Sequence, residues 1–311
     1  MRIVSKAEIA DVLTFSKLIP ALRAGFIDHS HGRAHSAPIT NIDFSSVNGE
    51  MHIKPGYLLS DNNICVKLVT CFYDNPGRGL PTRDGTIVVA DRQTGQFKAV
   101  LCDGGLITDM RTAGASAVAV DALAPEGGIE LGIIGTGTQA FWHVAAIACI
   151  RKIHAVKIWG RNELKSKEAA GRISRELNID AEATALQKVA HCDVVVSATP
   201  ARSPVLTTEV PKPGCVIVAM GADAVGKREI SARFAPKLAR VVADSIKQCK
   251  VYGELQWPEL AAREAYDLGE VLSQKATFKN RHPDDVVLFD STGLGFQDAV
   301  GAQLVLSSLG V

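Results

Sequence analysis

The stretch IELGIIGTGTQAFWHVAAIA (129–148) limits the possible folds of this chain more than any other feature. An apolar, strand-like run enters a glycine turn and continues directly into an apolar, helix-like run, and a second apolar run, AVKIWGR (155–161), follows. Strand, turn, helix and strand in this order form a βαβ unit of a parallel sheet. The spacing of Gly135, Gly137 and Ala140 is the G-x-G-x-x-A fingerprint of dinucleotide binding.

The chemistry of this turn follows from its small residues. Gly135 permits the tight turn, Gly137 puts no side chain in the way of a pyrophosphate, and Ala140 lets helix and strand pack closely. The first N–H groups of the helix attract phosphate charge. An ordinary glycine turn is the alternative, but motif and context together favour a bound NAD(P)H. We expect the cofactor to contact the turn and the ends of neighbouring strands, at Gly135, Thr136, Gly137, Gln139, Ala140, Arg161, Asn162, Ser197, Ala198, Thr199 and Met220.

The end of the second strand bears on which nicotinamide cofactor is used. An Asp or Glu usually follows this strand when the ribose keeps a free 2′-hydroxyl. Here the sequence reads VKIWGRN, and Arg161 stands where the carboxylate would be. A guanidinium suits a 2′-phosphate, so the sequence favours NADPH over NADH. Stacking of Arg161 over the adenine, which either cofactor allows, is the alternative.

The rest of the chain divides into two patterns on either side of the breaker-rich APEGG (124–128). After it, Val/Ile runs such as CDVVVSATP, GCVIVAMGAD and DDVVLFDST alternate with helical segments, which predicts an α/β, Rossmann-type parallel sheet covered on both faces. Before it, helical spacing over 6–26 precedes several strands, a hairpin turn at Thr94-Gly95 and an alanine-rich helix over 109–123. The first part is therefore a mixed α+β unit.

Charge and composition exclude several classes of protein. Basic and acidic residues number 34 and 33, mixed without a basic stripe, so we expect no nucleic-acid partner. No apolar run approaches a membrane span of about 18 residues. Charges at Lys6, Glu8 and Asp11 interrupt the segment where a signal peptide needs an apolar core. The chain is expected to be cytoplasmic.

Cysteine and histidine patterns give no metal site. The seven cysteines form no CxxC pair and lie mostly in apolar runs, so reduced core cysteines are expected rather than disulfides or zinc ligands. The histidines of DHSHGRAH (28–35) have spacings that suit a metal, but no cysteine or carboxylate recurs around them and Gly32 indicates a loop.

Three cations interrupt otherwise apolar or small-residue segments. Lys67 lies inside a strand-like run, where the choice is between a solvated edge residue and a cation directed into a pocket. Arg111, in TDMRTAGA, is expected in the first turn of its helix, where the helix end adds N–H donors for a carboxylate. Lys54, in HIKPGY, is a further candidate, with an exposed strand position as the alternative.

Two acidic residues follow strands of the parallel sheet, where ligands of open α/β sheets bind. Asp223 stands between Gly221 and Gly226, which indicates an unusual backbone and favours a functional carboxylate. Asp290 ends the strand of VVLFDSTG, and for this residue a structural, hydrogen-bonding role is favoured.

Several of these segments together resemble a known family. They occur in family order as VKLVTCFYDNPGRGLPTRDG, TDMRTAGASAVA, LGIIGTGTQA, IWGRN, MGADAVGKREI and FDSTGLGFQDAV. They resemble the ornithine cyclodeaminase/mu-crystallin family, over nearly the whole chain. The glycine loop alone is generic, whereas DxxGK.E and FDSTGLGFQD are far more specific.

The resemblance implies a two-domain subunit of a homodimer. We expect a substrate-binding and dimerisation domain of residues 1–118 and 296–311, with the last helix returning to it, and a Rossmann domain of residues 119–295. By the same resemblance Arg111 and Lys67 hold an amino-acid carboxylate, and Asp223 faces the substrate nitrogen. Lys67 and Asp223 are then the catalytic residues.

The resemblance also implies the reaction class. Family members transfer a hydride between a nicotinamide and Cα of a small amino or imino acid, and some cyclise ornithine to proline with loss of ammonia. Ornithine cyclodeaminases have Glu and Met about where this chain has His52 and Lys54. The segment HIKPGY is instead similar to imine-reducing members of the family, including iminosuccinate reductase and ectoine-utilisation members. We therefore expect reduction of an α-imino acid, with Lys54 and His52 as further substrate-binding residues. A cyclodeaminase and a non-catalytic mu-crystallin-like binding protein are the alternatives.

Overall fold

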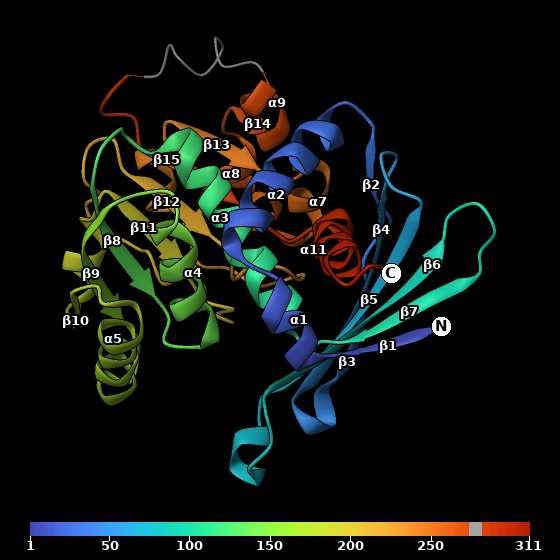
Figure 1. Cartoon of the computed structure of the whole chain (residues 1–311). Coiled ribbons are helices and arrows are strands. Elements are labelled where there is room, and N and C mark those ends of the chain that lie inside the picture. The colour runs from blue at the N-terminus through green and yellow to red at the C-terminus, as the bar shows by residue number, and fades with distance from the viewer. Residues whose placement is uncertain (274–281) are drawn as a thin grey trace. The chain divides into compact units, whose positions relative to one another are not determined.

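A computed structural model describes residues 1–273 and 282–311 of the chain (Figure 1). These residues form two compact units. Unit 1 contains Met1–Arg111 and Leu294–Val311, and unit 2 contains Thr112–Gly293. The boundaries set from the sequence lay slightly further along the chain, after 118 and after 295, so they assigned the middle of one long helix, α3 (Leu106–Leu123), to unit 1.

Unit 1 is built on a seven-stranded sheet in the order β1-β7-β6-β5-β4-β2, with β3 also paired to β4. Neighbouring strands are antiparallel except β1, which runs parallel to β7. The strands are Arg2–Ser5 (β1), Ala34–Ser36 (β2), Thr40–Phe44 (β3), Gly49–Leu58 (β4), Asn63–Phe72 (β5), Arg83–Asp91 (β6) and Phe97–Cys102 (β7), with 3-10 turns at Ser45–Val47 and Asn75–Arg78.

The helical spacing over 6–26 resolves into two helices rather than one, α1 (Lys6–Val12) and α2 (Phe15–Ser30). Ser5 caps α1 in a capping box with Glu8, and Leu13 is extended, so the chain breaks before α2 begins. The predicted hairpin at Thr94-Gly95 is present, with Gly95 in a left-handed conformation at φ +72°.

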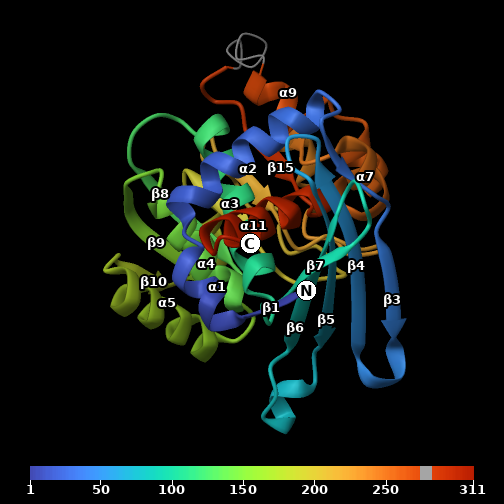
Figure 2. The same ribbon diagram turned by 45° about the vertical axis from the view of Figure 1, so that its right-hand side comes forward.

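The C-terminal helix α11 (Gly295–Ser308) belongs to unit 1, although the whole of unit 2 precedes it in the chain. It packs on β4 and β5 and beside α2, on one side of the unit 1 sheet (Figure 2). Phe26 of α2 meets Phe296 of α11 edge to face, with ring centroids 5.3 Å apart. Gly25 faces the same ring, where a side chain would have no room.

Unit 2 carries an eight-stranded sheet in the order β10-β9-β8-β11-β12-β15-β13-β14, in which all pairs are parallel. The strands are Ile129–Ile134 (β8), Ile153–Trp159 (β9), Ala181–Ala183 (β10), Val194–Ser197 (β11), Val216–Ala219 (β12), Arg240–Ala243 (β13), Ala265–Asp267 (β14) and Val287–Asp290 (β15). The order reverses between β8 and β11, as in a Rossmann sheet, so the predicted fold class is confirmed.

The helices of unit 2 alternate with these strands. Besides the C-terminal part of α3 they are α4 (Thr138–Ala148), α5 (Glu163–Leu177), α6 (Leu186–Ala190), α7 (Ile246–Tyr252), α8 (Pro258–Ala261) and α9 (Leu268–Ser273), with 3-10 turns at Ala235–Lys237 and Glu254–Gln256. None of the helices in the described residues has the length and apolar character that a membrane crossing requires.

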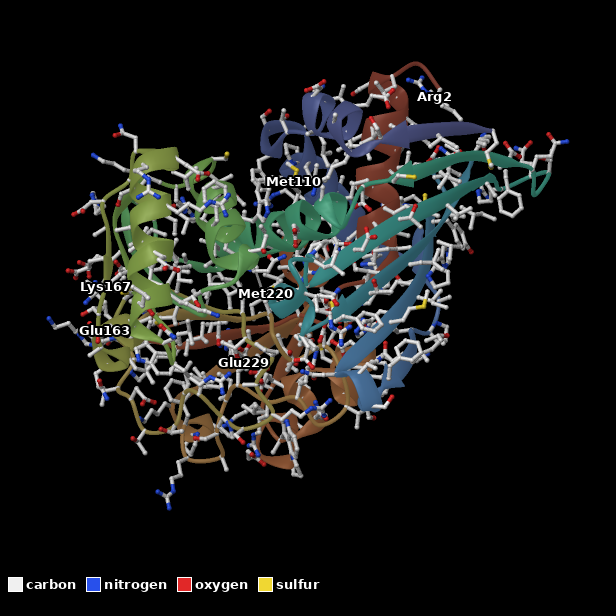
Figure 3. The ribbon with its side chains drawn as sticks, turned by 90° about the horizontal axis from the view of Figure 1, so that it is seen from below. Arg2, Met110, Glu163, Lys167, Met220 and Glu229 are labelled. Carbon is white, nitrogen blue, oxygen red and sulfur yellow. The ribbon has the colours of Figure 1, made fainter. Side chains whose placement is uncertain are left out.

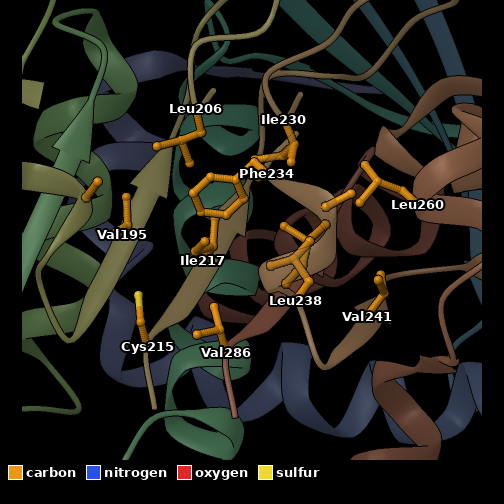
Figure 4. Packing of buried hydrophobic residues seen from close by; sticks show 14 of the residues in the cluster. Val195, Leu206, Cys215, Ile217, Ile230, Phe234, Leu238, Val241, Leu260 and Val286 are labelled. Atoms are coloured by element: carbon orange, nitrogen blue, oxygen red, sulfur yellow. The ribbon is translucent and has the colours of Figure 1, made fainter. Parts of the chain in front are cut away.

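A hydrophobic cluster fills one side of the unit 2 sheet (Figure 4). Val195 of β11 and Ile217 of β12 contribute to it from the sheet, and Phe234 and Leu238 from the segment that follows β12; all are essentially inaccessible. This core holds the strands rigid, so the loops at their carboxyl ends can keep a fixed shape.

Of the seven cysteines, all of which are free, four are buried, at 65, 192, 215 and 249. Cys102 and Cys149 are exposed, so the expectation of core cysteines is wrong for these two. Cys149 follows the last residue of α4, and the apolar run that contains it ends at the surface.

Candidate functional site

Lys67 lies on β5, in the middle of the unit 1 sheet, and its side chain is on the face that α11 covers. Only 1% of the residue is exposed. The solvated-edge interpretation is therefore wrong, because β5 is flanked by β4 and β6 and the amine is buried.

Lys54 of β4 is directly opposite Lys67 in the β4–β5 register. It is 4% exposed, so the alternative of an exposed strand lysine is wrong. Like charges facing each other across a strand pair destabilise a sheet. Two buried lysines in this register therefore require anions close by.

Asp298 of α11 is one such anion. The Nζ of Lys67 donates to Oδ1 of Asp298 at 3.1 Å and lies 3.0 Å from Oδ2. Arg111 of α3 approaches the same carboxylate, with Nε 2.9 Å from Oδ1, and its Nη1 donates to Oε1 of Gln297 at 3.0 Å. Lys67, Asp298 and Arg111, which we call the charge triad, come from three elements of unit 1.

A backbone contact between α11 and β4 puts Asp298 in this place. A Cβ on Gly295 would lie 2.1 Å from the carbonyl oxygen of Pro55, and a Cβ on Gly56 would lie 2.2 Å from the carbonyl carbon of Gly295. Only glycine at both positions lets helix and strand touch this closely. Asp298 is one helical turn beyond Gly295, so the contact brings its carboxylate down onto the sheet.

Burial and mutual charge set the protonation of the triad. Burial, and then the nearby Arg111 guanidinium, lower the pKa of Lys67 to about 7, while Asp298 opposes this fall. Burial alone would raise the pKa of Asp298, but the charges of Arg111 and Lys67 outweigh it and hold that pKa below its usual value. The carboxylate is thus ionised at neutral pH, and Lys67 is poised to titrate there.

The expected position of Arg111 in the first turn of its helix is wrong. Helix α3 begins at Leu106, so Arg111 lies in the second turn and its backbone N–H is not at the helix end. Asp103 instead lies at the N-terminal end of α3, where its Oδ2 accepts a hydrogen bond from the N–H of Ile107 at 2.8 Å. Arg111 can therefore attract a carboxylate through its guanidinium alone.

His52 lies two residues before Lys54 on β4, so both side chains are on one face of the strand, and His52 is 4% exposed. Its Nε2 is 3.5 Å from Oε1 of Glu50, an oxygen that also accepts from the hydroxyl of Tyr73 at 2.5 Å. The other ring nitrogen, Nδ1, is buried and has no hydrogen-bond partner among the described residues. His52 thus has one ring nitrogen near the Glu50 carboxylate and one buried nitrogen without a partner among the described residues.

In unit 2 the glycine turn between β8 and α4 has the geometry that a dinucleotide requires. Gly135 has φ +117°, and a Cβ there would lie 2.7 Å from the carbonyl oxygen of Ala198. Gly137 is the N-cap of α4; it is exposed, a Cβ on it would meet nothing within 4 Å, and no side chain caps the helix. Uncapped N–H donors with open space in front of them fit a pyrophosphate.

The residues after β9 adjoin the same turn. Gly160 packs against Thr136, since a Cβ on this glycine would lie 2.6 Å from Thr136 Cγ2. Arg161 is exposed. Asn162 is the N-cap of α5, and its side-chain oxygen accepts from the N–H of Lys165 at 3.0 Å.

Glu229, which is labelled in Figure 3, accepts hydrogen bonds from residues at the ends of β11 and β12. It is fully buried and accepts from the hydroxyls of Ser197 and Thr199 at 2.6 and 2.7 Å and from the N–H groups of Thr199 and Gly221, both at 2.9 Å. The Ser197 side chain is fully buried in this network, so its hydroxyl is already bonded within the protein. Met220, also expected at the cofactor, is held by a 2.8 Å bond from its N–H to the Ser197 carbonyl.

Further buried carboxylates continue from Glu229 along the carboxyl ends of the strands. Glu254 accepts from the N–H of Glu229 at 2.6 Å, and Asp290 accepts from the N–H groups of Glu254 and Leu255 at 3.0 and 2.9 Å. Burial raises the pKa of Asp290 to about 7 and raises that of Glu254. Asp290 therefore has the structural contacts of a loop anchor.

Asp223 follows β12 in unit 2. Its side chain is 35% exposed, and Oδ1 accepts from the Nζ of Lys227 at 2.8 Å. Lys227 is buried and comes one residue after Gly226, which has φ +79°. This left-handed glycine turns the chain so that Lys227 can orient the carboxylate of Asp223.

The networks include charged residues that the sequence does not single out, notably Asp298, Glu229 and Lys227. Each lies inside a motif that had been recognised, FDSTGLGFQD or DAVGKREI. The signal was a charged residue in a segment that otherwise reads as buried. A charge in such a segment needs a partner, but the sequence does not show which one.

A parallel sheet with a dinucleotide turn, joined in one chain to a sheet with buried cations, defines a two-domain α/β protein of the Rossmann class. The family model for the ornithine cyclodeaminase/mu-crystallin family matches residues 1–310. The chain belongs to this family.

Individual relatives span several activities. The chain is 34% identical to an uncharacterized cyclodeaminase of Sinorhizobium fredii over 86% of this chain and 82% of the relative. It is 31% identical to the iminosuccinate reductase of Paracoccus denitrificans over 98% of this chain and 96% of the relative. The structure of Thermococcus litoralis Delta(1)-pyrroline-2-carboxylate reductase in complex with NADH and L-proline superposes with a TM-score of 0.91 at 26% identity, covering 100% of this chain and 99% of that one.

Proposed function

We propose that this chain is a nicotinamide-dependent oxidoreductase that reduces a small α-imino acid, of the ketimine, pyrroline-2-carboxylate or iminosuccinate type, to the L-amino acid. The observation that carries the proposal is the charge triad. Lys67 and Arg111 share a single carboxylate, Asp298, so the triad keeps a net charge of +1 when Lys67 is protonated. A buried excess of positive charge favours an anionic ligand such as a carboxylate.

The activities of relatives support the same substrate class. An iminosuccinate reductase and a pyrroline-2-carboxylate reductase are similar over nearly the whole chain, and both act on an α-imino carboxylate by name. The dinucleotide turn at Gly135 and Gly137 fits the cofactor that such a reduction needs. When bound there, the nicotinamide would supply the hydride.

In this proposal each charged residue has one task. Arg111 and Lys67 bind and orient the substrate carboxylate, and Asp223 stabilises the positive charge of the protonated imine nitrogen. The bond between Lys227 and Asp223 holds that carboxylate in one orientation. Lys67, whose pKa is about 7, can also exchange a proton near neutral pH.

We propose NADPH as the preferred cofactor. The support is the exposed Arg161 after β9 and the absence of Asp or Glu in the segment from Trp159 to Asn162. An Arg161→Ala variant should lose affinity for NADPH and not for NADH. Equal losses for both cofactors would indicate that Arg161 contacts the adenine instead.

We propose that Lys54 and His52 recognise a second polar group of the substrate, such as the distal carboxylate of iminosuccinate. Both lie on the triad's side of β4 and are 4% exposed. Lys54→Met should then reduce kcat/KM for iminosuccinate more than for pyrroline-2-carboxylate. An unchanged ratio of the two would contradict this role.

We propose a homodimer formed through the other face of the unit 1 sheet. That face carries partly exposed apolar side chains of two central strands: Met51, Ile53 and Tyr57 of β4, and Ile64, Val66 and Leu68 of β5. A second copy of this chain would cover them. Sedimentation of the wild type should give a dimer and that of Val66→Lys a monomer; a monomeric wild type would contradict the proposal.

A second candidate function is a cyclodeaminase that recycles NAD+, because the relative from Sinorhizobium fredii is named as one. The decisive experiment is a panel of cyclic and acyclic α-imino acids with NADH and NADPH, run beside L-ornithine with NAD+. Net oxidation of the reduced cofactor supports the reductase. Ammonia release from ornithine without net reduction supports the cyclodeaminase. No turnover with cofactor binding retained would indicate a binding protein.

A further inference from the structure

Asp298 is the only residue that binds both cations of the charge triad among the described contacts of unit 1. We propose that Asp298 is a positioning residue that holds Lys67 and Arg111 side by side and favours the protonated form of Lys67, which binds a carboxylate ligand. The inference deepens the function proposed above and rests on it, because the ligand that both cations would share is the substrate carboxylate.

The geometry restricts both cations to one arrangement. The amine of Lys67 lies within 3.1 Å of both oxygens of Asp298, and Arg111 uses Nε for the same carboxylate. Arg111 Nη1 is fixed by Gln297, the residue before Asp298 on α11. Neither bond uses Nη2. Two adjacent residues of one helix thus fix two sides of the guanidinium and leave its remaining amino group for a ligand.

The surroundings of Lys67 explain why this anion decides its charge. Titratable and charged groups surround Lys67 on several elements. They are Asp103 in the loop after β7, Arg111 on α3, Asp298 on α11, Lys54 on β4 and Cys65 on β5. Arg111 and Lys54 both lower the pKa of Lys67, and Asp298 is the carboxylate bonded to its amine. Without Asp298, burial and two cations would all favour the neutral amine.

Asp103 does not substitute for Asp298. Its carboxylate is bonded to the N–H of Ile107 at the start of α3, and burial raises its pKa. Loss of Asp298 would therefore leave Lys67 with no bonded carboxylate. A neutral Lys67 cannot contribute charge to carboxylate binding, so substrate affinity would fall at neutral pH and recover only at lower pH.

The isosteric variant Asp298→Asn tests this directly, by titration of the lysine side chains in protein labelled with ¹³C at lysine Cε. The Lys67 signal is assigned from its absence in Lys67→Met. We expect its midpoint to move to lower pH by about one pH unit or more in Asp298→Asn. The matched control is Asp290→Asn. It removes another fully buried carboxylate, which accepts from backbone N–H groups and contacts no lysine or arginine among the described residues, so the Lys67 midpoint should stay in place. An unmoved midpoint in Asp298→Asn overturns the proposal.

The titration needs no substrate, so it separates this inference from the proposed function. If the wild type turns over no imino acid, the proposed function fails, while the shift still reports on Asp298. If turnover is found, Asp298→Asn should raise KM at pH 8 far more than at pH 6, with a smaller change in kcat. A variant that binds NADPH normally but has a uniformly lowered kcat at all pH values would show a merely structural role and overturn the proposal.

Discussion

At the scale of single residues, this chain buries charges and polar groups in several places and partners them unequally. Lys67 and Arg111 share a carboxylate, and Glu229 satisfies four donors with one side chain. His143 of α4, in contrast, is fully buried and neither ring nitrogen has a hydrogen-bond partner among the described residues. A buried polar group without such a partner lowers stability.

Arg111→Ala should weaken carboxylate binding, because a charge-assisted contact contributes about 1.5–3 kcal/mol. This corresponds to a KM roughly 10- to 150-fold higher for the substrate that the imino-acid panel identifies. Steady-state kinetics measure it, and Arg111→Lys, which keeps the charge but loses the fork, should fall between wild type and Ala. The role is wrong if Arg111→Ala leaves both KM and kcat intact.

His143→Leu should raise the free energy of unfolding, since an unsatisfied buried polar group costs about 1–3 kcal/mol. Burial lowers the pKa of His143 to about 3, so between pH 6.5 and 3 the unfolded chain binds a proton that the folded chain does not. The wild type therefore loses stability on acidification through this range, and His143→Leu should lose less. Thermal melts at pH 5 and 7 measure both effects, with the exposed His282→Leu as control.

Asp290→Asn should show the opposite pH dependence. The pKa of Asp290 is raised to about 7 by burial, so its contribution to stability is fully present below pH 4 and is lost as pH rises to about 7. The stability advantage of the wild type over Asp290→Asn should shrink from pH 5 to pH 8 in the same melts. A constant difference would mean that Asp290 is ionised throughout.

At the scale of elements, small local features decide where helices and strands meet. Leu13, which is extended, divides the N-terminal helical pattern into α1 and α2, a break that apolar spacing does not show. Strands β10 and β14 have three residues each and were missed, since such short segments carry little periodicity. The long strands β4 and β5 were predicted because turn residues bound each of them.

Gly295→Ala should disrupt the contact between α11 and β4. The added Cβ would lie 2.1 Å from a backbone oxygen of β4, which cannot move without breaking the sheet. We expect a loss of roughly 1–3 kcal/mol in unfolding free energy, together with loss of substrate binding because Asp298 shifts with the helix. Chemical denaturation and kinetics measure both. Gly77→Ala is the control, because its Cβ would meet nothing within 4 Å.

At the scale of the whole molecule, the chain leaves unit 1 at Arg111, forms unit 2 and returns at Leu294. The resemblance had implied this return, and the triad gives it a physical purpose. Lys67 and Arg111 precede unit 2 in the chain, and Asp298, whose carboxylate binds both of them, follows it. The buried cations of unit 1 therefore lack their carboxylate partner until α11 has packed on the unit 1 sheet.

The sequence by itself determined the parallel sheet of unit 2, the dinucleotide turn and the candidate cations. Each of these follows from local pattern: apolar runs between helices, glycine spacing, and charges within strands. The burial of Lys54 and the pairing of Asp298 with Lys67 depended on the tertiary structure alone. The paired residues are 231 positions apart. Sequence spacing shows that a buried charge needs a partner, but only the folded chain brings that partner within hydrogen-bond distance.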